Sequence, residues 1–169
     1  MGRRHDGAGR NLGGGRMELD KIKIEGVVKI TMADVITGEV EITKYKNIIP
    51  LVARAVIARR LLSSSGGNDG LITYGAVGTG TTAAASGDTK LQIELARKVL
   101  ASSSVTSNVL TVRVFFTTSE ANGDLREYGL FGEDATAAAD SGTLFERVNI
   151  NRTKTNTKTL LIESRITIS

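Results

Sequence analysis

The sequence LLIESRITI, residues 160–168, indicates the fold class. Leu160, Ile162, Ser164, Ile166 and Ile168 occupy every second position, and most residues between them are polar. A period of two places one set of side chains on one face of a β-strand and the other set on the opposite face. This stretch is therefore predicted to be a half-buried strand.

The rest of the last third of the chain is also dense in strand signals. Residues 105–117 include VLTVRVFF, which is rich in the β-branched and aromatic residues that favour strands. Further strands are predicted at residues 125–131 and 143–150, and Asn122-Gly123-Asp124 is a turn signal. The predicted fold is mainly β: an antiparallel β-sandwich or partly open barrel with one or two short helices.

The first half of the chain predicts a hairpin and then a helix. Alternation in residues 19–46, interrupted by a turn at Thr37-Gly38, predicts the hairpin, with Val40 and Ile42 supplying the apolar side of the return strand. Residues 50–63 are predicted to be a helix that starts at Pro50. Its apolar stripe would consist of Leu51, Val52, Ala55, Val56 and Leu62.

The type of secondary structure is less clear from the sequence in the middle of the chain. Residues 71–77 predict a short, largely apolar strand. Residues 89–100 fit either an extended segment or a helix, because Leu91 and Leu95 also have helical spacing.

Composition narrows the range of chemistry. The chain has 169 residues and 40% hydrophobic content, which suits one compact domain with an aliphatic core. It contains no cysteine and one histidine, His5, so disulfides, thiolate metal sites and most histidine-dependent catalysis are excluded within one chain. The sequence therefore predicts a protein that is not an enzyme and has no cofactor, catalytic residues or metal site. No apolar run approaches the ~18–20 residues needed to cross a bilayer, so no membrane partner is expected.

The positive charge is concentrated at the N-terminus. Residues 1–18 form a glycine- and arginine-rich arm, and residues 19–169 are predicted to be a single β-rich domain whose C-terminal strands span residues 105–169. The arm's arginines hold most of the net charge of +4, so the domain itself carries no footprint of specific nucleic-acid binding. An alternative is that translation starts at Met17, after Gly14-Gly15-Arg16. Basic residues of the arm and of the hairpin are the predicted partner-binding set: Arg3, Arg4, Arg10, Arg16, Lys21, Lys23 and Lys29.

Two sequence features suggest chemistry only weakly. Residues 78–83, GTGTTA, match the dinucleotide fingerprint, but Gly87 interrupts the helix that such a site requires. Five acids, Glu120, Asp124, Glu127, Glu133 and Asp134, lie close in sequence. Nothing marks one of them as buried, and solvated loop charges are the simpler interpretation, although a cation site in residues 132–140 is conceivable.

Several motifs occur in a distinctive order. The first is ITYGAVGTGTT (residues 72–82), followed by SGDTKL (residues 86–91), Glu94 and Arg97. REYGLFG (residues 126–132), GTLF (residues 142–145) and Arg147-Val148 come later. This order resembles a group of tailed-phage virion proteins described as tail-fibre-like or tail structural proteins, across residues 19–169. The resemblance implies a β-rich domain with an oligomeric role in a virus particle, and it brings no catalytic residues.

The function expected from the sequence is thus that of a virion structural protein in the tail, baseplate or neck of a phage-like virus. Its expected partners are copies of itself, as a trimer or hexamer, and other virion proteins. A capsid decoration protein and a receptor- or glycan-binding fibre module are the alternatives. A glycan-binding module would require exposed aromatic side chains in a groove.

Overall fold

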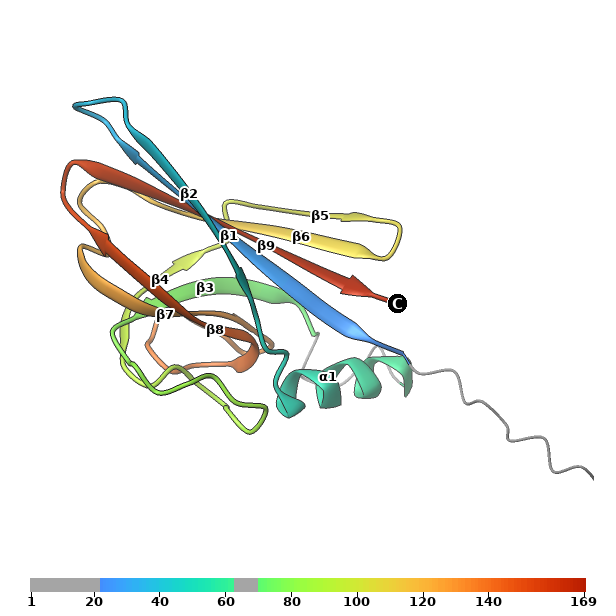
Figure 1. The fold of residues 1–169 in the computed structure, drawn as a ribbon. Helices are drawn as coiled ribbons and strands as arrows, with labels where there is room; N and C mark the ends of the chain where they lie inside the picture. Colours follow the sequence, from blue (N-terminus) through green and yellow to red (C-terminus); the bar gives the residue numbers. More distant parts are fainter. Residues whose placement is uncertain (1–21, 63–69) are drawn as a thin grey trace, which may run out of the picture.

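The computed structural model describes residues 22–62 and 70–169 of the chain, which form two stacked antiparallel β-sheets and a short helix (Figure 1). The elements within these residues are β1 (Ile24–Asp34), β2 (Val40–Lys46), α1 (Leu51–Leu62), β3 (Ile72–Gly78), β4 (Glu94–Val99), β5 (Ser102–Thr106), β6 (Val109–Phe116), β7 (Gly123–Gly132), β8 (Thr143–Lys154) and β9 (Lys158–Ile168).

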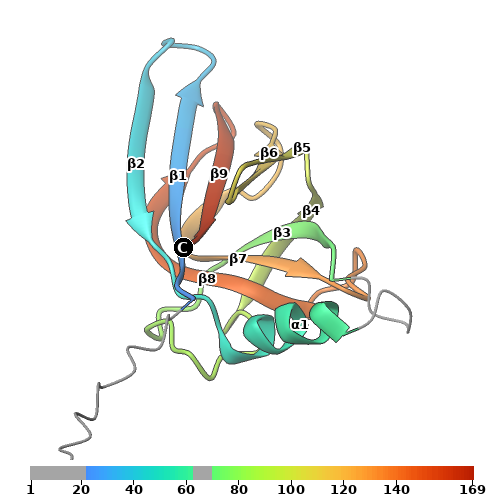
Figure 2. The same ribbon diagram turned by 90° about the vertical axis from the view of Figure 1, so that its right-hand side faces the viewer.

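The strand order of the two sheets places the C-terminal strand at the centre of the larger one. The five-stranded sheet has the order β2-β1-β9-β6-β5, and the four-stranded sheet has the order β4-β3-β7-β8. The β1–β2 hairpin extends beyond the rest of the molecule, at the opposite end of the five-stranded sheet from α1 (Figures 1 and 2). The mainly β, sandwich-like fold predicted from the sequence is confirmed, without a closed barrel in the described residues.

The main core lies between the two sheets and is largely aliphatic. Alternate residues of β1, β6 and β9 meet alternate residues of β3, β7 and β8. The largest of these buried side chains are Ile30, Phe116, Leu125, Tyr128, Leu130, Leu160 and Ile162. A smaller apolar cluster of Ala76, Leu91, Phe131 and Leu144 lies on the other face of the four-stranded sheet, with Val52 of α1 packed against it.

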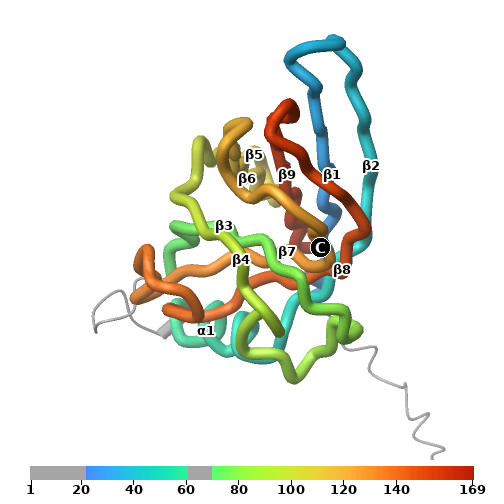
Figure 3. Tube along the Cα trace, turned by 90° about the vertical axis from the view of Figure 1, so that its left-hand side faces the viewer, coloured from blue at the N-terminus to red at the C-terminus, as the bar shows by residue number. Residues whose placement is uncertain are grey.

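The outer face of one sheet is covered by other parts of the chain, and that of the other sheet is not. The outer face of the four-stranded sheet is covered by the long connection that leads from β3 to β4 (Figure 3). Helix α1 packs along β8, with Ala53 and Val56 in the main core and Val52 against the smaller cluster. The outer face of the five-stranded sheet is not covered by any described segment (Figures 1 and 2).

The individual strand predictions have mixed outcomes. The alternation in LLIESRITI is confirmed, since Leu160, Ile162, Ser164 and Ile166 are all buried. The extended alternative for residues 89–100 is the correct one, because β4 occupies Glu94–Val99. The strand signal of VLTVRVFF is confirmed as β6, but the separate strand β5 before it was not predicted. The chain reverses at Ser107, whose φ is 53°, and forms the two strands β5 and β6.

The predicted apolar side of the hairpin is wrong. Val40 and Ile42 are 56% and 61% exposed, while Tyr45 of the same strand packs against the core. The register decides this, because Tyr45 pairs with the buried Val28 and Ile42 pairs with the outward-facing Thr31. Neighbouring residues across a sheet share a face, so the inner side of β2 is set by β1 and not by its own apolar residues.

The helix is found where it was predicted, but its predicted apolar stripe is only partly correct. Val56 is buried and Val52 packs against the smaller cluster, as predicted. Leu51 is 57% exposed and Ala55 is also exposed, whereas Ala53 is buried, and the side chain of Leu62 is not among those described. The face is set by the position of β8, against which α1 packs. Among the described residues, no helix has the length and apolar content required to cross a membrane.

Candidate functional site

The motif residues that carry the resemblance meet at a buried carboxylate. Glu127 of β7 is fully buried on the outer side of the four-stranded sheet. Its Oε1 accepts hydrogen bonds from the backbone amides of Gly80 and Ile93 at 3.1 and 2.8 Å, and its Oε2 accepts one from Gln92 at 2.9 Å. Arg147 of β8 donates to the same Oε2 from Nη2 at 2.7 Å.

Arg147 links this carboxylate to the loop that follows β3. Its Nη1 lies 2.6 Å from Oδ2 of Asp88, and its Nη2 donates to the carbonyl of Thr82. Burial would lower the pKa of Arg147, but the hydrogen bonds and charges of Asp88 and Glu127 raise it above its usual value. A Cβ at Gly78 or Gly80 would come within 2.6 Å of Glu127 Oε1, so both positions require glycine.

The loop therefore binds an internal anion. In a dinucleotide site, the amides of a glycine-rich loop and of the helix that follows bind a pyrophosphate. Here the amide of Gly80 donates to Glu127, and residues 79–93 contain no helix. The interpretation of Glu127 as a solvated loop charge is consequently wrong. Its partner Arg147, and Asp88, the second carboxylate that Arg147 binds, are far away in sequence, and no local signal identified them.

A second pair of motif residues, Glu94 and Arg97, binds the loop between β7 and β8 to the outer side of the four-stranded sheet. Arg97 and Glu94 of β4 form an ion pair with an Nε–Oε1 distance of 2.8 Å, and both side chains are almost fully buried. The Arg97 guanidinium stacks 4.1 Å from the centre of the Phe131 ring and donates to the carbonyl of Ser141 at 2.8 Å. The motif residues thus hold the loops over the four-stranded sheet, which is a structural role.

The outer face of the five-stranded sheet offers a broad surface of a different kind. We call it the outer face and define it by the outward residues of β2, β1, β9 and β6. One row across it is largely apolar: Ile42, Thr31, Leu161 and Phe115 are neighbours in register. Ile42 and Phe115 are 61% and 39% exposed. Val40 extends this apolar row along β2.

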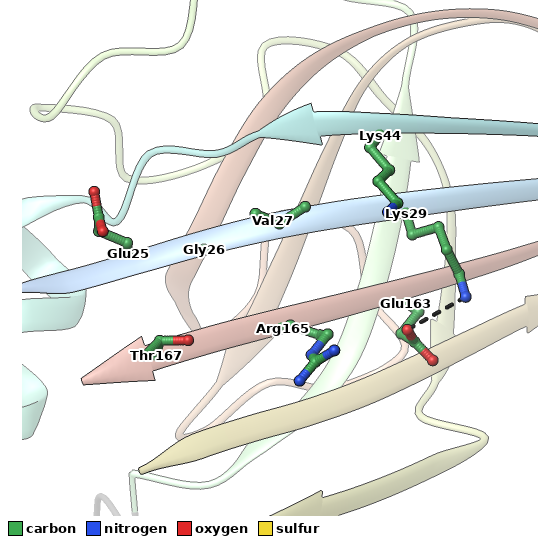
Figure 4. A pocket seen from close by; sticks show the side chains of 8 residues that line it. All are labelled: Glu25, Gly26, Val27, Lys29, Lys44, Glu163, Arg165 and Thr167. Atoms are coloured by element: carbon green, nitrogen blue, oxygen red, sulfur yellow. Dashed lines mark ion pairs between the residues drawn. The ribbon is translucent and has the colours of Figure 1, made fainter. Parts of the chain in front are cut away.

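Two basic rows lie next to the apolar one. The first contains Lys44, Lys29, Glu163 and Arg113, and the second contains Lys46, Val27, Arg165 and Thr111. A shallow hollow of about 460 Å³ lies between the strands here, lined by Lys29, Lys44, Glu163 and Arg165 among others (Figure 4). The two rows hold five cationic side chains and one carboxylate.

Glu163 neutralises only part of this charge. Its carboxylate lies 2.6 Å from Arg113 Nη2 and 3.5 Å from Lys29 Nζ. Partial burial would raise its pKa, but the hydrogen bond from Arg113 and the charge of Lys29 lower it below the usual value. Lys44 and Arg165 form no ion pair with any described residue. The outer face therefore keeps a net positive charge.

The predicted partner-binding residues are separated by the structure. Lys29 belongs to the outer face. Lys23 directly precedes β1 and forms an ion pair with Glu25 at 2.9 Å. Arg3, Arg4, Arg10, Arg16 and Lys21, like the predicted arm of residues 1–18, lie outside the described residues. Sequence reasoning missed Lys44, Arg113 and Arg165 as companions of Lys29, because strand register alone brings them together.

One further carboxyl group is buried between the sheets. Glu146 of β8 is fully buried, and Ser164 Oγ donates to its Oε1 at 2.8 Å. Its Oε2 has no hydrogen-bond partner in the described part of the chain. Burial raises the pKa of Glu146 to about 7. Nearby, the hydroxyl of Tyr128 lies 3.3 Å from Ser164 Oγ.

Comparisons with known proteins returned no relative. No protein-family model, no curated protein and no solved structure matches the chain. Within residues 22–62 and 70–169, no three histidine or acidic side chains gather in a way that could hold a metal ion.

Proposed function

We propose that this protein is a structural subunit of a tailed phage-like virus particle and has no catalytic role. It would assemble as a homo-oligomer, a trimer or hexamer, in the tail, baseplate or neck. The virus particle is suggested by the order of the sequence motifs, and the observation that supports assembly is the uncovered outer face of the five-stranded sheet.

The outer face has the composition of a surface that packs against another protein. An apolar row next to unneutralised cations combines area that water disfavours with charge that orients a partner. Each Å² of apolar surface removed from water contributes about 25 cal/mol, so covering Ile42, Leu161 and Phe115 would favour association. The cations predict that the covering surface is acidic.

The aromatic residues argue against a glycan-binding module. All three tyrosines and four phenylalanines of the chain lie in the described residues. Phe115 is the exposed one among them, and it lies on a flat sheet face next to Leu161. The other aromatic side chains are buried or half-buried, so the grouped, exposed rings that stack on a sugar are not present in these residues.

Particle incorporation tests this proposal. An antibody against the protein should label purified particles of the virus at one fixed position in electron micrographs. The double variant Ile42→Lys/Phe115→Lys should fold but should be incorporated at a small fraction of the wild-type level when it is the only copy supplied. Incorporation should fall because, in the variant, packing a neighbour against the outer face would bury two unpaired lysine charges in an apolar contact.

The matched control is Leu95→Lys on β4, because Leu95 is 45% exposed and lies on the other sheet. It should be incorporated normally. The proposal would be abandoned if particles lack the protein and the purified wild-type chain sediments as a monomer at high concentration. Normal incorporation of the double variant would show that the outer face is not the surface through which the protein assembles.

A further inference from the structure

The turn of the β1–β2 hairpin presents two bare aliphatic side chains. Val35 and Ile36 are 62% and 77% exposed at the end of the hairpin that extends beyond the rest of the molecule (Figures 1 and 2). We call this turn, residues 34–38, the tip.

The tip is held in one conformation. Asp34 Oδ1 accepts hydrogen bonds from the amides of Ile36 and Thr37 at 2.9 and 3.1 Å. The turn between β8 and β9 supports it from the side, because the amide of Val35 donates to the carbonyl of Thr157 at 2.9 Å. Gly38 closes the turn with a φ of 76°. A rigid turn loses little conformational entropy when it docks, so its apolar side chains are suited to binding.

An apolar groove lies at the opposite end of the same sheet. It is bounded by the ends of β1, β5, β6 and β9, by α1 and by the start of β3, and it has a volume of about 360 Å³. Its lining includes Ile24, Ile57, Val105, Leu110, Phe145 and Ile168. Val105 and Ile168 are 71% and 44% exposed. The groove is thus an open apolar site of the size that holds branched aliphatic side chains.

A chain cannot place its own tip in its own groove. Ile24 lines the groove and Asp34 begins the tip, and the two residues are the first and last of β1. The ten steps between them span about 33 Å of extended strand. Contact between tip and groove is therefore possible only between two copies.

The charges at the two ends are complementary. Asp34 and Glu39 are the acids of the tip and its flank. At the groove, Arg60 lies beside Gly70, which lines the groove, and Lys23 adjoins Ile24, with 64% of its side chain exposed and with Glu25 as its partner within the chain. Opposite charges around an apolar contact favour the correct orientation of the two copies.

We propose that the tip of one copy docks in the groove of the next, so that Val35 and Ile36 fill the apolar site between α1 and the five-stranded sheet. This inference rests on the proposed function and specifies how the homo-oligomer forms. The two surfaces differ, so the contact is head-to-tail, and it generates a ring if the rotation between copies closes.

Cysteine cross-linking tests the contact directly, because the natural chain contains no cysteine. Full-length Ile36→Cys and Val105→Cys chains, carrying different tags, are mixed and oxidised. The disulfide-linked pair of differently tagged chains should form in at least about tenfold greater yield than with Ile93→Cys in place of Ile36→Cys, because docking raises the local thiol concentration. Ile93 is 55% exposed and lies outside both surfaces, so it is a matched control.

A second measurement does not depend on cross-linking. Ile36→Asp should weaken self-association by about tenfold or more in sedimentation experiments, while Ile93→Asp should leave it unchanged. Because Ile36 is exposed, circular dichroism and the melting temperature should be the same for wild type and variant.

Other occupants of the groove would give different results. Preferential Ile36→Cys homodimers would indicate a tip-to-tip contact and would overturn the inference. An intramolecular disulfide in a monomeric Leu19→Cys/Val105→Cys chain would show that the chain's own N-terminal segment fills the groove, and would also overturn it. Oligomers that form without the tip–groove cross-link would refute this contact but leave the proposed function standing. A wild-type chain that stays monomeric and is absent from particles would refute both.

Discussion

Two buried glutamates of this chain occupy opposite electrostatic environments. Glu127 receives backbone amides and an arginine, so its charged form is well solvated by the protein. Glu146 has one hydroxyl donor and no cation close by, and its pKa is raised to about 7 by burial. A buried carboxylate needs hydrogen bonds or a cation to replace lost water, and Glu146 has too few of them.

Glu146 should make folding stability depend on pH. Below pH 4.5 the carboxyl is protonated in both the folded and the unfolded chain, and no penalty arises. As the pH rises towards 7, the unfolded chain releases the proton first, so stability falls by up to about 3 kcal/mol. Glu146→Gln should remove this loss. Urea unfolding should find the variant more stable than wild type at pH 8, but not at pH 4.

Glu120 is the control of opposite sign. The hydrogen bond from Lys98 and those from Thr117 lower its pKa to about 2. Its contribution to stability is therefore present at neutral pH and is lost as the pH falls from about 4.5 towards 2. Glu120→Gln should destabilise the protein at pH 7 but not at pH 2. If Glu146→Gln shows the same pattern as Glu120→Gln, the raised pKa of Glu146 is wrong.

The loop after β3 predicts a contrast between two glycines. A Cβ at Gly80 would lie 2.4 Å from both Glu127 Oε1 and Gln92 Cβ, whereas a Cβ at Gly87 would meet nothing within 4 Å. Gly80→Ala should therefore lower the free energy of unfolding by about 1–3 kcal/mol. Gly87→Ala should be neutral or stabilise by about 0.4–1 kcal/mol. Chemical denaturation of the two variants measures both effects, and equal effects would contradict the role given to Glu127.

At the scale of elements, α1 shows how packing selects a helix face. Its sequence is apolar around much of its circumference, so the spacing alone offers more than one stripe. The face that packs contains Ala53 and Val56, because β8 and the main core between the sheets lie on that side.

A pair of helix variants distinguishes the two faces. Val56→Ala should cost about 1–2 kcal/mol of stability, because it leaves a cavity in the core. Leu51→Ala should change stability by less than about 0.5 kcal/mol, because Leu51 is 57% exposed. Thermal or urea unfolding gives both values. A larger loss of stability for Leu51→Ala than for Val56→Ala would indicate that Leu51 is buried, as the sequence predicted.

For the whole molecule, the strand order predicts a gradient of local stability. β9 is hydrogen-bonded to β1 on one side and to β6 on the other, whereas β2 and β5 are edge strands. Every residue of β5 is exposed, and none of β2 is fully buried. Local opening requires less free energy where few apolar contacts are broken.

Hydrogen exchange should follow that gradient. The amides of β9 and the inner amides of β6 should exchange most slowly, and those of β5 and β2 fastest in the monomer. On assembly, slower exchange at the tip and in β5, which borders the groove, would accompany the proposed head-to-tail contact. A uniform rate across the five-stranded sheet would contradict the strand order as the source of local stability.

The sequence by itself determined the β-rich fold class, most strand positions and the extent of the helix. The reason is that periods of two and 3.6 are local, and a residue's neighbours in the chain carry them. It did not determine which face of β2 or α1 is buried, the ion pair of Glu127 with Arg147, or the basic rows around Lys29. Those depend on register and on contacts between residues 20 to more than 100 positions apart, so only the tertiary structure decided them.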